Sequence, residues 1–217
     1  MEYHRACEYH AHDQWDPLPL ADVIDVFRGA PFRWWIVGGY ALELHTGRTW
    51  REHADVDIGV SRVDLEPLWK VLRPWDPHVA AQSALTPWSG QVLDATAHEN
   101  GLWCRSTSGG PWQFEVLVDD STRTEWVYRR DPTVRRPWSE AILTTADGVP
   151  YLAPELTLLF KSKHVREKDT IDAAEVIPEL TPSQQHNLAA LLPSGHSWRT
   201  IIPGGTAPQH NTERRNQ

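Results

Sequence analysis

Two aspartates two residues apart, Asp55 and Asp57, lie in the hydrophobic segment ADVDIGV at residues 54–60. In a β-strand, successive side chains point to opposite faces, so both carboxylates leave the same face about 7 Å apart. Two carboxylates on one face repel each other unless a cation offsets their charge, and Mg²⁺ prefers oxygen ligands. The pair therefore indicates a magnesium site. A solvated strand face at a sheet edge is the alternative interpretation of the pair alone.

Two adjacent glycines, Gly38 and Gly39, separate the apolar run WWIV at 34–37 from a helical segment at 40–47. Small residues at the start of a helix let the backbone approach a phosphate, and the free N–H groups of the first turn favour an anion. A glycine pair on its own is also typical of a simple turn. The spacing is therefore informative only together with the acidic pair that follows.

Two basic residues precede the acidic pair. Arg51 is suited either to hold a phosphate or to pair with an acid. His53 is suited either to a structural hydrogen bond or to proton transfer. Both roles stay open from the residues alone.

The complete segment 35–60 resembles the DNA-polymerase-β-like nucleotidyltransferase superfamily. Its R-x-H-x-D-x-D order with GGYA before it resembles the branch of aminoglycoside and lincosamide nucleotidyltransferases, with Tyr40 in place of a Trp. The matching positions are Gly38, Gly39, Ala41, Gly47, Arg51, His53, Asp55 and Asp57. Beyond this segment, the resemblance depends on the order of elements and on residues 150–172.

The resemblance implies a third carboxylate on a later strand of the same sheet. Glu115 is the favoured residue because it is central in the apolar run WQFEVLV, where an unused acid would be costly. Asp94 and Asp119 are the alternatives. Because the family more often has Asp at this position, a Glu is a departure from its pattern.

The roles that the resemblance implies are as follows. Asp55, Asp57 and Glu115 would bind Mg²⁺ and act in catalysis, while the nucleotide would be held by Gly38, Gly39, Arg51 and Lys161. The expected reaction moves a nucleoside monophosphate, AMP from ATP or the equivalent from another triphosphate, to a hydroxyl of a small acceptor. We expect that acceptor to be cationic and aminoglycoside-like, which makes antibiotic resistance the expected role. A toxin-type nucleotidyltransferase acting on RNA or protein, and an inactive nucleotide-binding protein, are the alternatives.

Composition narrows the class of protein. The chain has 217 residues and a formal net charge of −8, which argues against unaided binding of a long nucleic acid and suits a cationic small substrate. The sequence contains no run of about 18 apolar residues, which a membrane-spanning helix would require. Two cysteines are too few for a disulfide framework, and no signal peptide is visible, so we expect a cytoplasmic protein.

The order of elements predicts an α+β fold, in which a mixed sheet is flanked by helices. We expect a polar leader at 1–16, a nucleotidyltransferase domain at 17–150, a helical C-terminal part at 151–202 and a disordered tail at 203–217. Helical spacing occupies 17–30, 40–47 and 63–73, strand patterns occupy 34–37, 54–60 and much of 76–150, and helical spacing returns from Ala153.

Overall fold

The computed structural model describes residues 7–8 and 14–203. A mixed nine-stranded sheet runs through this part of the chain in the order β1-β5-β4-β6-β7-β3-β2-β11-β10. Neighbouring strands are antiparallel except β3 with β7 and β2 with β11, which are parallel. The strands are β1 (Cys7–Glu8), β2 (Trp34–Ile36), β3 (Asp57–Ser61), β4 (His78–Ala81), β5 (Ala84–Pro87), β6 (Gly101–Cys104), β7 (Phe114–Asp119), β10 (Ile142–Thr144) and β11 (Pro150–Leu152).

A separate two-stranded ribbon consists of β8 (Glu125–Val127) and β9 (Arg135–Pro137). The helices are α1 (Leu20–Phe27), α2 (Gly38–Thr46), α3 (Leu65–Leu72), α4 (Trp138–Ala141), α5 (Pro154–Ser162), α6 (Glu167–Val176) and α7 (Pro182–Leu191). Three short 3₁₀ turns lie at Arg62–Asp64, Ile177–Glu179 and Ser197–Thr200. The predicted α+β class with a mixed sheet and a helical C-terminal part is confirmed.

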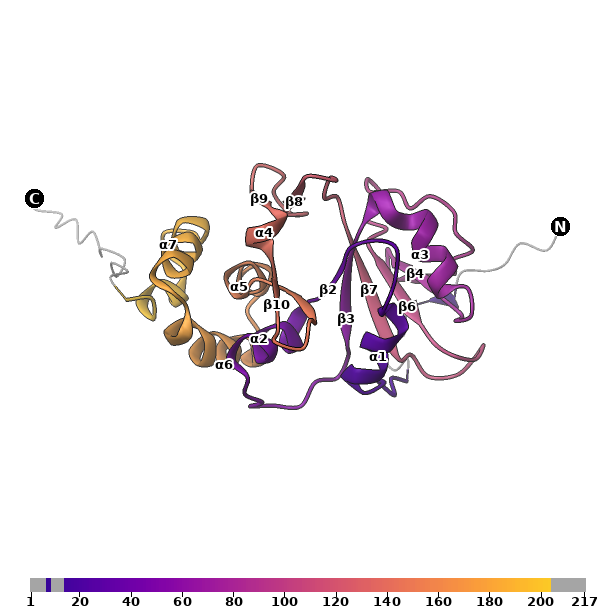
Figure 1. Ribbon diagram of the computed structural model, residues 1–217, viewed down its shortest axis with the longest axis horizontal. Coiled ribbons are helices and arrows are strands. Elements are labelled where there is room, and N and C mark those ends of the chain that lie inside the picture. The colour runs from indigo at the N-terminus through magenta and orange to yellow at the C-terminus, as the bar shows by residue number, and fades with distance from the viewer. Residues whose placement is uncertain (1–6, 9–13, 204–217) are drawn as a thin grey trace, which may run out of the picture.

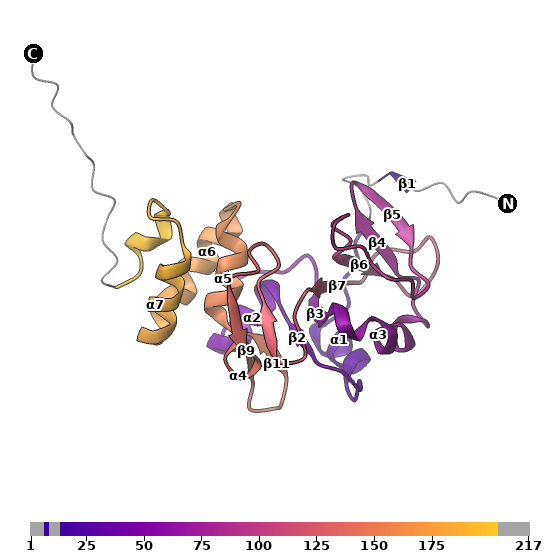
Figure 2. The same ribbon diagram turned by 90° about the horizontal axis from the view of Figure 1, so that it is seen from above.

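Figure 1 shows the sheet strands β3 and β7 in the middle of the molecule, with α1 and α3 on one side and α5, α6 and α7 on the other. Viewed from above, α6 and α7 lie at the end opposite to β4 and β5 (Figure 2). Helix α2 lies beside α5 and α6, with which it makes direct contacts. Helix α5 also packs directly on the sheet, because Leu156 and Leu159 share a buried cluster with Trp35 of β2.

Alternation along the two central strands separates the core from the site. On β3 and β7, Ile58, Val60, Val116 and Val118 belong to the same buried cluster as the apolar faces of α1 and α3. The intervening positions of both strands, which include Asp57 and Glu115, face the opposite side. One face thus supplies burial of apolar surface, and the other is free to carry polar groups.

The observed boundaries differ slightly from the predicted ones. Strand β11 continues the sheet to Leu152, two residues past the boundary expected at 150, because Tyr151 pairs with Ile36 of β2. In the predicted polar leader, Cys7–Glu8 pairs with β5 and Trp15 bridges to Trp112. The rest of the leader up to residue 13, and residues 204–217 of the tail, lie outside the described residues. None of the helices described is both long and apolar enough to span a bilayer.

Candidate active site

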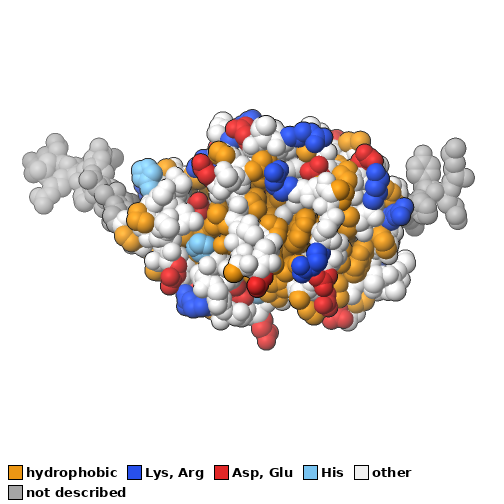
Figure 3. Space-filling model, in the orientation of Figure 1, with side chains coloured by type: hydrophobic (Ala, Val, Ile, Leu, Met, Phe, Trp, Pro, Cys, Tyr) orange, Lys and Arg blue, Asp and Glu red, His pale blue; other side chains and the backbone are white. Residues whose placement is uncertain are grey.

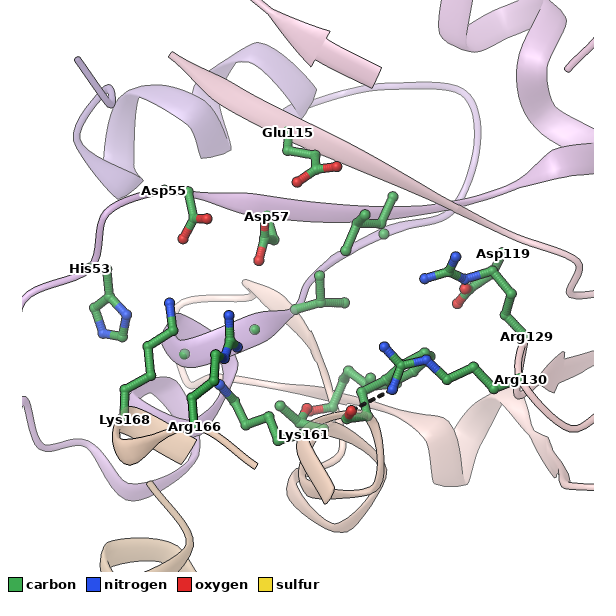
Figure 4. Close-up of a pocket in the computed structure, with 18 of the residues that line it drawn as sticks. His53, Asp55, Asp57, Glu115, Asp119, Arg129, Arg130, Lys161, Arg166 and Lys168 are labelled. Carbon is green, nitrogen blue, oxygen red and sulfur yellow. Dashed lines mark hydrogen bonds between the residues drawn. The ribbon is translucent and has the colours of Figure 1, made fainter. Parts of the chain in front are cut away.

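A pocket of about 360 Å³ opens between the polar face of the sheet and the C-terminal helices. Side chains from β3, β7, α5 and the segment before α6 line it, together with the start of α2. In the space-filling view, basic and acidic side chains lie scattered around exposed apolar surface on one face of the molecule (Figure 3). Figure 4 shows the acidic side chains of the pocket on the strand side and the basic side chains of Lys161, Arg166 and Lys168 facing them. The volume is within the range of small-molecule sites.

The predicted acidic pair lines this pocket. Asp57 begins β3, and its Oδ1 is buried without a hydrogen-bond partner among the described residues. Burial, followed by repulsion from Asp55, raises the pKa of Asp57 to about 7. A buried carboxylate oxygen with no donor is unfavourable on its own, so the donor set fits a hard cation such as Mg²⁺.

Glu115 lies directly opposite Asp57 because β3 and β7 are parallel and in this register. Burial, followed by repulsion from Asp57 and Asp55, raises the pKa of Glu115 well above its usual value. Its Oε1 lies so close to Gly101 of β6 that a Cβ at that glycine would be only 2.6 Å away. A hydrogen bond from Trp103, also on β6, acts in the opposite direction on that pKa.

The three acids share the pocket without forming a compact metal cage. Among the described residues, no three His, Cys, Asp or Glu side chains are grouped closely enough to hold a metal ion. The Glu115 carboxyl lies against Gly101 of β6 and comes from the strand next to Asp57. The arrangement therefore offers a cation the Asp55–Asp57 pair, with Glu115 beside it.

The glycine pair forms the first turn of α2 at the rim of this pocket. Gly38 has φ +68°, and a Cβ there would lie 2.6 Å from Asp57 Oδ2. At Gly39 a Cβ would collide with the side chains of His53 and Arg51. Both positions thus need glycine for close approach, and the backbone N–H groups of the turn are available to an anion.

Arg51 and Lys161 also line the pocket, but both are paired with acids of α6. Arg51 donates from Nε to Asp172 Oδ1 at 2.7 Å and from Nη2 to Oδ2 at 2.8 Å. Lys161 Nζ lies 2.9 Å from Asp172 Oδ2 and 3.1 Å from Asp169 Oδ1. Their positive charge at the pocket is therefore largely offset by two buried carboxylates.

Further cations reach the pocket that the motif alone did not identify. Arg166 and Lys168 face the acidic pair in Figure 4, and both lower the pKa of Asp57. Lys168 forms no hydrogen bond or ion pair with any described residue, so its charge is available. Arg129 and Arg130 follow β8 and line the other end of the pocket. Arg129, Arg130 and Arg166 lie in turns or at a helix cap, where no periodic pattern marks them, and Lys168 lies in the first turn of α6.

The two alternative acids are in different places. Asp94 is exposed, lies outside the pocket and accepts hydrogen bonds from Thr96 N and Oγ1. Asp119 lines the pocket at the end of β7, four residues beyond Glu115. Of the three acids considered from sequence, Glu115 is therefore the one opposite Asp57.

His53 lines the pocket next to the glycine turn. Its Nε2 lies 3.0 Å from Glu43 Oε1 on α2, and the Tyr40 ring lies 4.1 Å away, measured between ring centroids. Burial is the largest effect on His53 and lowers its pKa, so the imidazole is neutral at pH 7. Packing thus fixes this ring beside the glycine turn.

Similarity to known proteins is found in sequence and in structure. Residues 19–75 match the family model described as aminoglycoside-2''-adenylyltransferase. The search of curated proteins finds no match.

Among solved structures, the chain is similar to lincomycin-bound lincosamide antibiotic adenylyltransferase LnuA, with 15% identity, TM-score 0.48, and coverage of 76% of this chain and 95% of that one. It is similar to the antibiotic-resistance factor ANT(2'')-Ia, with 12% identity, TM-score 0.49, and coverage of 79% and 87%. An antigenic nucleotidyltransferase-like protein from Paracoccidioides brasiliensis gives 20% identity, TM-score 0.42, and coverage of 79% and 84%.

The matched segment contains both glycines of the α2 turn and both aspartates of the acidic pair. The prediction of a nucleotidyltransferase enzyme that resembles the aminoglycoside and lincosamide branch is therefore confirmed by this family match.

Proposed function

We propose that the protein transfers a nucleoside monophosphate, AMP from ATP, to a hydroxyl of a small, aminoglycoside-like acceptor in a Mg²⁺-dependent reaction. The observation that carries the proposal is the register of β3 and β7, which sets Glu115 opposite Asp57 beside the glycine turn of α2. Antibiotic resistance and a cytoplasmic location are part of the same proposal. The match over residues 19–75 supports it.

Asp55 and Asp57 would hold Mg²⁺ through their carboxylate oxygens. When bound, the ion neutralises charge on the triphosphate and on the oxygen that leaves the α-phosphorus. The N–H groups of Gly38 and Gly39 bind the β- and γ-phosphates at the positive end of α2. Lys168 and Arg166 add positive charge from the facing side of the pocket.

Glu115 is the group placed to take the proton of the attacking hydroxyl. The hydroxyl oxygen forms a bond to the α-phosphorus as the bond to pyrophosphate breaks, and the proton passes to a carboxylate oxygen. In the absence of a cation, burial and the neighbouring carboxylates raise the pKa of Glu115. Positive charge near the acidic pair lowers that pKa and makes the side chain a base near neutral pH.

The direct test supplies Mg²⁺, each labelled nucleoside triphosphate, and a panel of aminoglycosides, lincosamides, tRNA and cell extract. Release of pyrophosphate together with a labelled antibiotic supports the proposal. A labelled tRNA or protein product would favour the toxin-type alternative. Nucleotide binding without pyrophosphate release, for every acceptor, would favour the inactive binding protein. The Asp57→Asn protein is the matched blank for background hydrolysis.

A further inference from the structure

The end of the pocket away from the glycine turn contains a buried acid that the proposed chemistry does not use. Asp119 is 5% exposed and lines the pocket at the end of β7. Trp126 Nε1 donates to its Oδ2 at 3.1 Å, and the structure records no hydrogen bond from a described residue to its Oδ1. Such a buried carboxylate is unfavourable unless a ligand or a cation uses it.

A guanidinium accompanies this acid. Arg129 lines the same end of the pocket and lowers the pKa of Asp119 by its charge. It forms neither a hydrogen bond nor an ion pair with any residue in the described part of the chain. Its neighbour Arg130 is engaged, because Nη1 donates to the Phe160 carbonyl at 2.6 Å and the guanidinium lies over the Phe160 ring (Figure 4). Arg129 is therefore the arginine with free donors.

The rest of the lining is mainly apolar. Val37, Leu117, Leu152 and Phe160 line the pocket together with Thr157, and the Trp35 indole, whose Nε1 has no hydrogen-bond partner among the described residues, covers Gly59. Glu115 and Asp119 are four residues apart on one strand, which separates the two ends by about 13 Å. The pocket thus has a phosphate-binding end, a mainly apolar lining and a hydrogen-bonding end, which is the layout of a nucleoside triphosphate.

We propose that Asp119 and Arg129 bind the edge of the nucleobase and select adenine. The exocyclic N6 amine donates to the Asp119 carboxylate, and the ring N1 accepts from the Arg129 guanidinium. This inference rests on the proposed function, because it takes the triphosphate to lie at the Gly38–Gly39 turn. It assigns the choice of nucleotide to two residues outside the family-matched segment 19–75.

A cationic acceptor does not fit this end of the pocket. Arg129 and Arg130 bring two positive charges against the one negative charge of Asp119, so an ammonium group would meet net repulsion. A neutral edge that offers one donor and one acceptor satisfies both Asp119 and Arg129. The acceptor antibiotic must then approach the α-phosphorus from elsewhere.

Hypoxanthine is the most informative probe, because the donor and the acceptor on its Watson–Crick edge are the reverse of those of adenine. Its O6 is an acceptor and its N1 carries a proton, so inosine triphosphate sets an acceptor against Asp119 and a donor against Arg129. Calorimetry with Mg²⁺ at pH 8 measures the affinities of the 217-residue chain for ATP and for inosine triphosphate. We expect ATP to bind about 10- to 100-fold more tightly, the range typical of buried polar groups left unpaired.

Two variants and one control complete the test. Asp119→Asn adds an amide donor that suits O6, so the ATP preference should fall to within about threefold. Arg129→Met should weaken ATP binding more than inosine triphosphate binding. Asp120→Asn changes the adjacent exposed acid, which pairs with Arg62 outside the pocket, and should leave the preference intact.

Equal affinity of the wild type for both nucleotides would overturn the inference, even if pyrophosphate release upholds the proposed function. An unchanged preference in Asp119→Asn, with a raised KM for the antibiotic, would assign this end to the acceptor and also overturn it. An ATP preference that Asp119→Asn removes would uphold the inference, even if no acceptor is ever modified and the proposed transfer fails.

Discussion

Arg51 and Asp172 are 121 residues apart in the chain and form a bidentate ion pair, with N–O distances of 2.7 and 2.8 Å. Asp172 is fully buried on α6, and it also accepts from Trp50 Nε1 at 3.0 Å. This contact joins the segment just before the acidic pair to the C-terminal helices. The geometry of the pocket between them therefore depends on a buried charged network.

Asp172→Asn should destabilise the protein by about 3–5 kcal/mol. The substitution leaves the buried charges of Arg51 and Lys161 without their shared partner, and removing one member of a buried pair is far costlier than removing an exposed one. Urea-induced unfolding measures the loss. Glu175→Gln, which affects an exposed pair with Arg48, is the control and should cost less than about 1 kcal/mol. Equal losses for the two variants would mean that the network does not hold the helices in place.

Glu115→Gln should lower kcat by about 10²- to 10⁴-fold, the usual contribution of a positioned general base. If Glu115 acts as the base, the Mg²⁺ dependence of nucleotide binding should change little, whereas a loss of Mg²⁺ affinity would make it a metal ligand. Asp94→Asn is the matched control, because Asp94 is exposed and the amide retains the oxygen that caps Thr96. A large loss of activity in Asp94→Asn with none in Glu115→Gln would reverse the choice of third acid.

Much of the fold could be predicted from local patterns. The alternation in ADVDIGV predicts that Asp57 and Ile58 point to opposite faces of the sheet. In strand β3, Ile58 is buried in the core and Asp57 lies on the other face. The place of Glu115 in an apolar run favours it as the third acid, and the register of β7 puts it opposite Asp57. For Asp57 the signal is the alternation of acidic and apolar residues, and for Glu115 it is a charged residue within an apolar run.

The basic side of the pocket could not be predicted in the same way. The assignment of Lys161 and Arg51 to the nucleotide stays a prediction, but their pairing with Asp172 depends on how α6 docks. Arg129 and Lys168 come to the pocket from a loop after β8 and from α6. Contacts between segments far apart in the chain decide these positions, and periodicity within one segment carries no information about them.

Asp119→Asn should stabilise the protein at pH 8 and have little effect at pH 4. Burial raises the pKa of Asp119 to about 7 in the folded state, against about 3.9 in an unfolded chain. The folded state therefore holds the proton longer, and the free energy of unfolding falls as pH rises from about 4 to about 7. Asparagine does not titrate, so the variant avoids this loss of unfolding free energy, which amounts to at most about 4 kcal/mol.

Thermal unfolding of the two proteins at pH 4 and pH 8 measures the difference. Asp120→Asn, on the exposed neighbour, should show a much smaller gap between the two pH values, because the charge of Asp120 is only a minor cause of the raised pKa of Asp119. A gain for Asp119→Asn that is the same at both pH values would show that Asp119 is not protonated in the folded protein.

Gly38→Ala should reduce activity beyond its effect on stability. Alanine at φ +68° costs about 1–2 kcal/mol, and its Cβ would also lie 2.6 Å from Asp57 Oδ2. Gly109→Ala is the matched control, because Gly109 has φ +76° and a Cβ at that position would meet nothing within 4 Å. The two variants should lose similar stability in urea, while only Gly38→Ala raises the Mg²⁺ concentration needed for half-maximal rate. If both variants have similar kinetics, the glycine turn does not take part in catalysis or in Mg²⁺ binding.

Asp57→Asn should lower the rate by about three decades, or about 4 kcal/mol of transition-state stabilisation, because it removes a charge where the electrostatics of the site are organised. Without Mg²⁺, its Tm should equal or exceed that of the wild type, because burial and Asp55 raise the pKa of Asp57 to about 7 and the neutral amide is spared that cost. With Mg²⁺ and ATP, the wild type should gain more stability than the variant, since only tight binding to the folded state raises Tm. A structural aspartate would behave in the opposite way: Asp57→Asn would lower Tm by the same amount with and without Mg²⁺, and the magnesium site would have to lie elsewhere in the pocket.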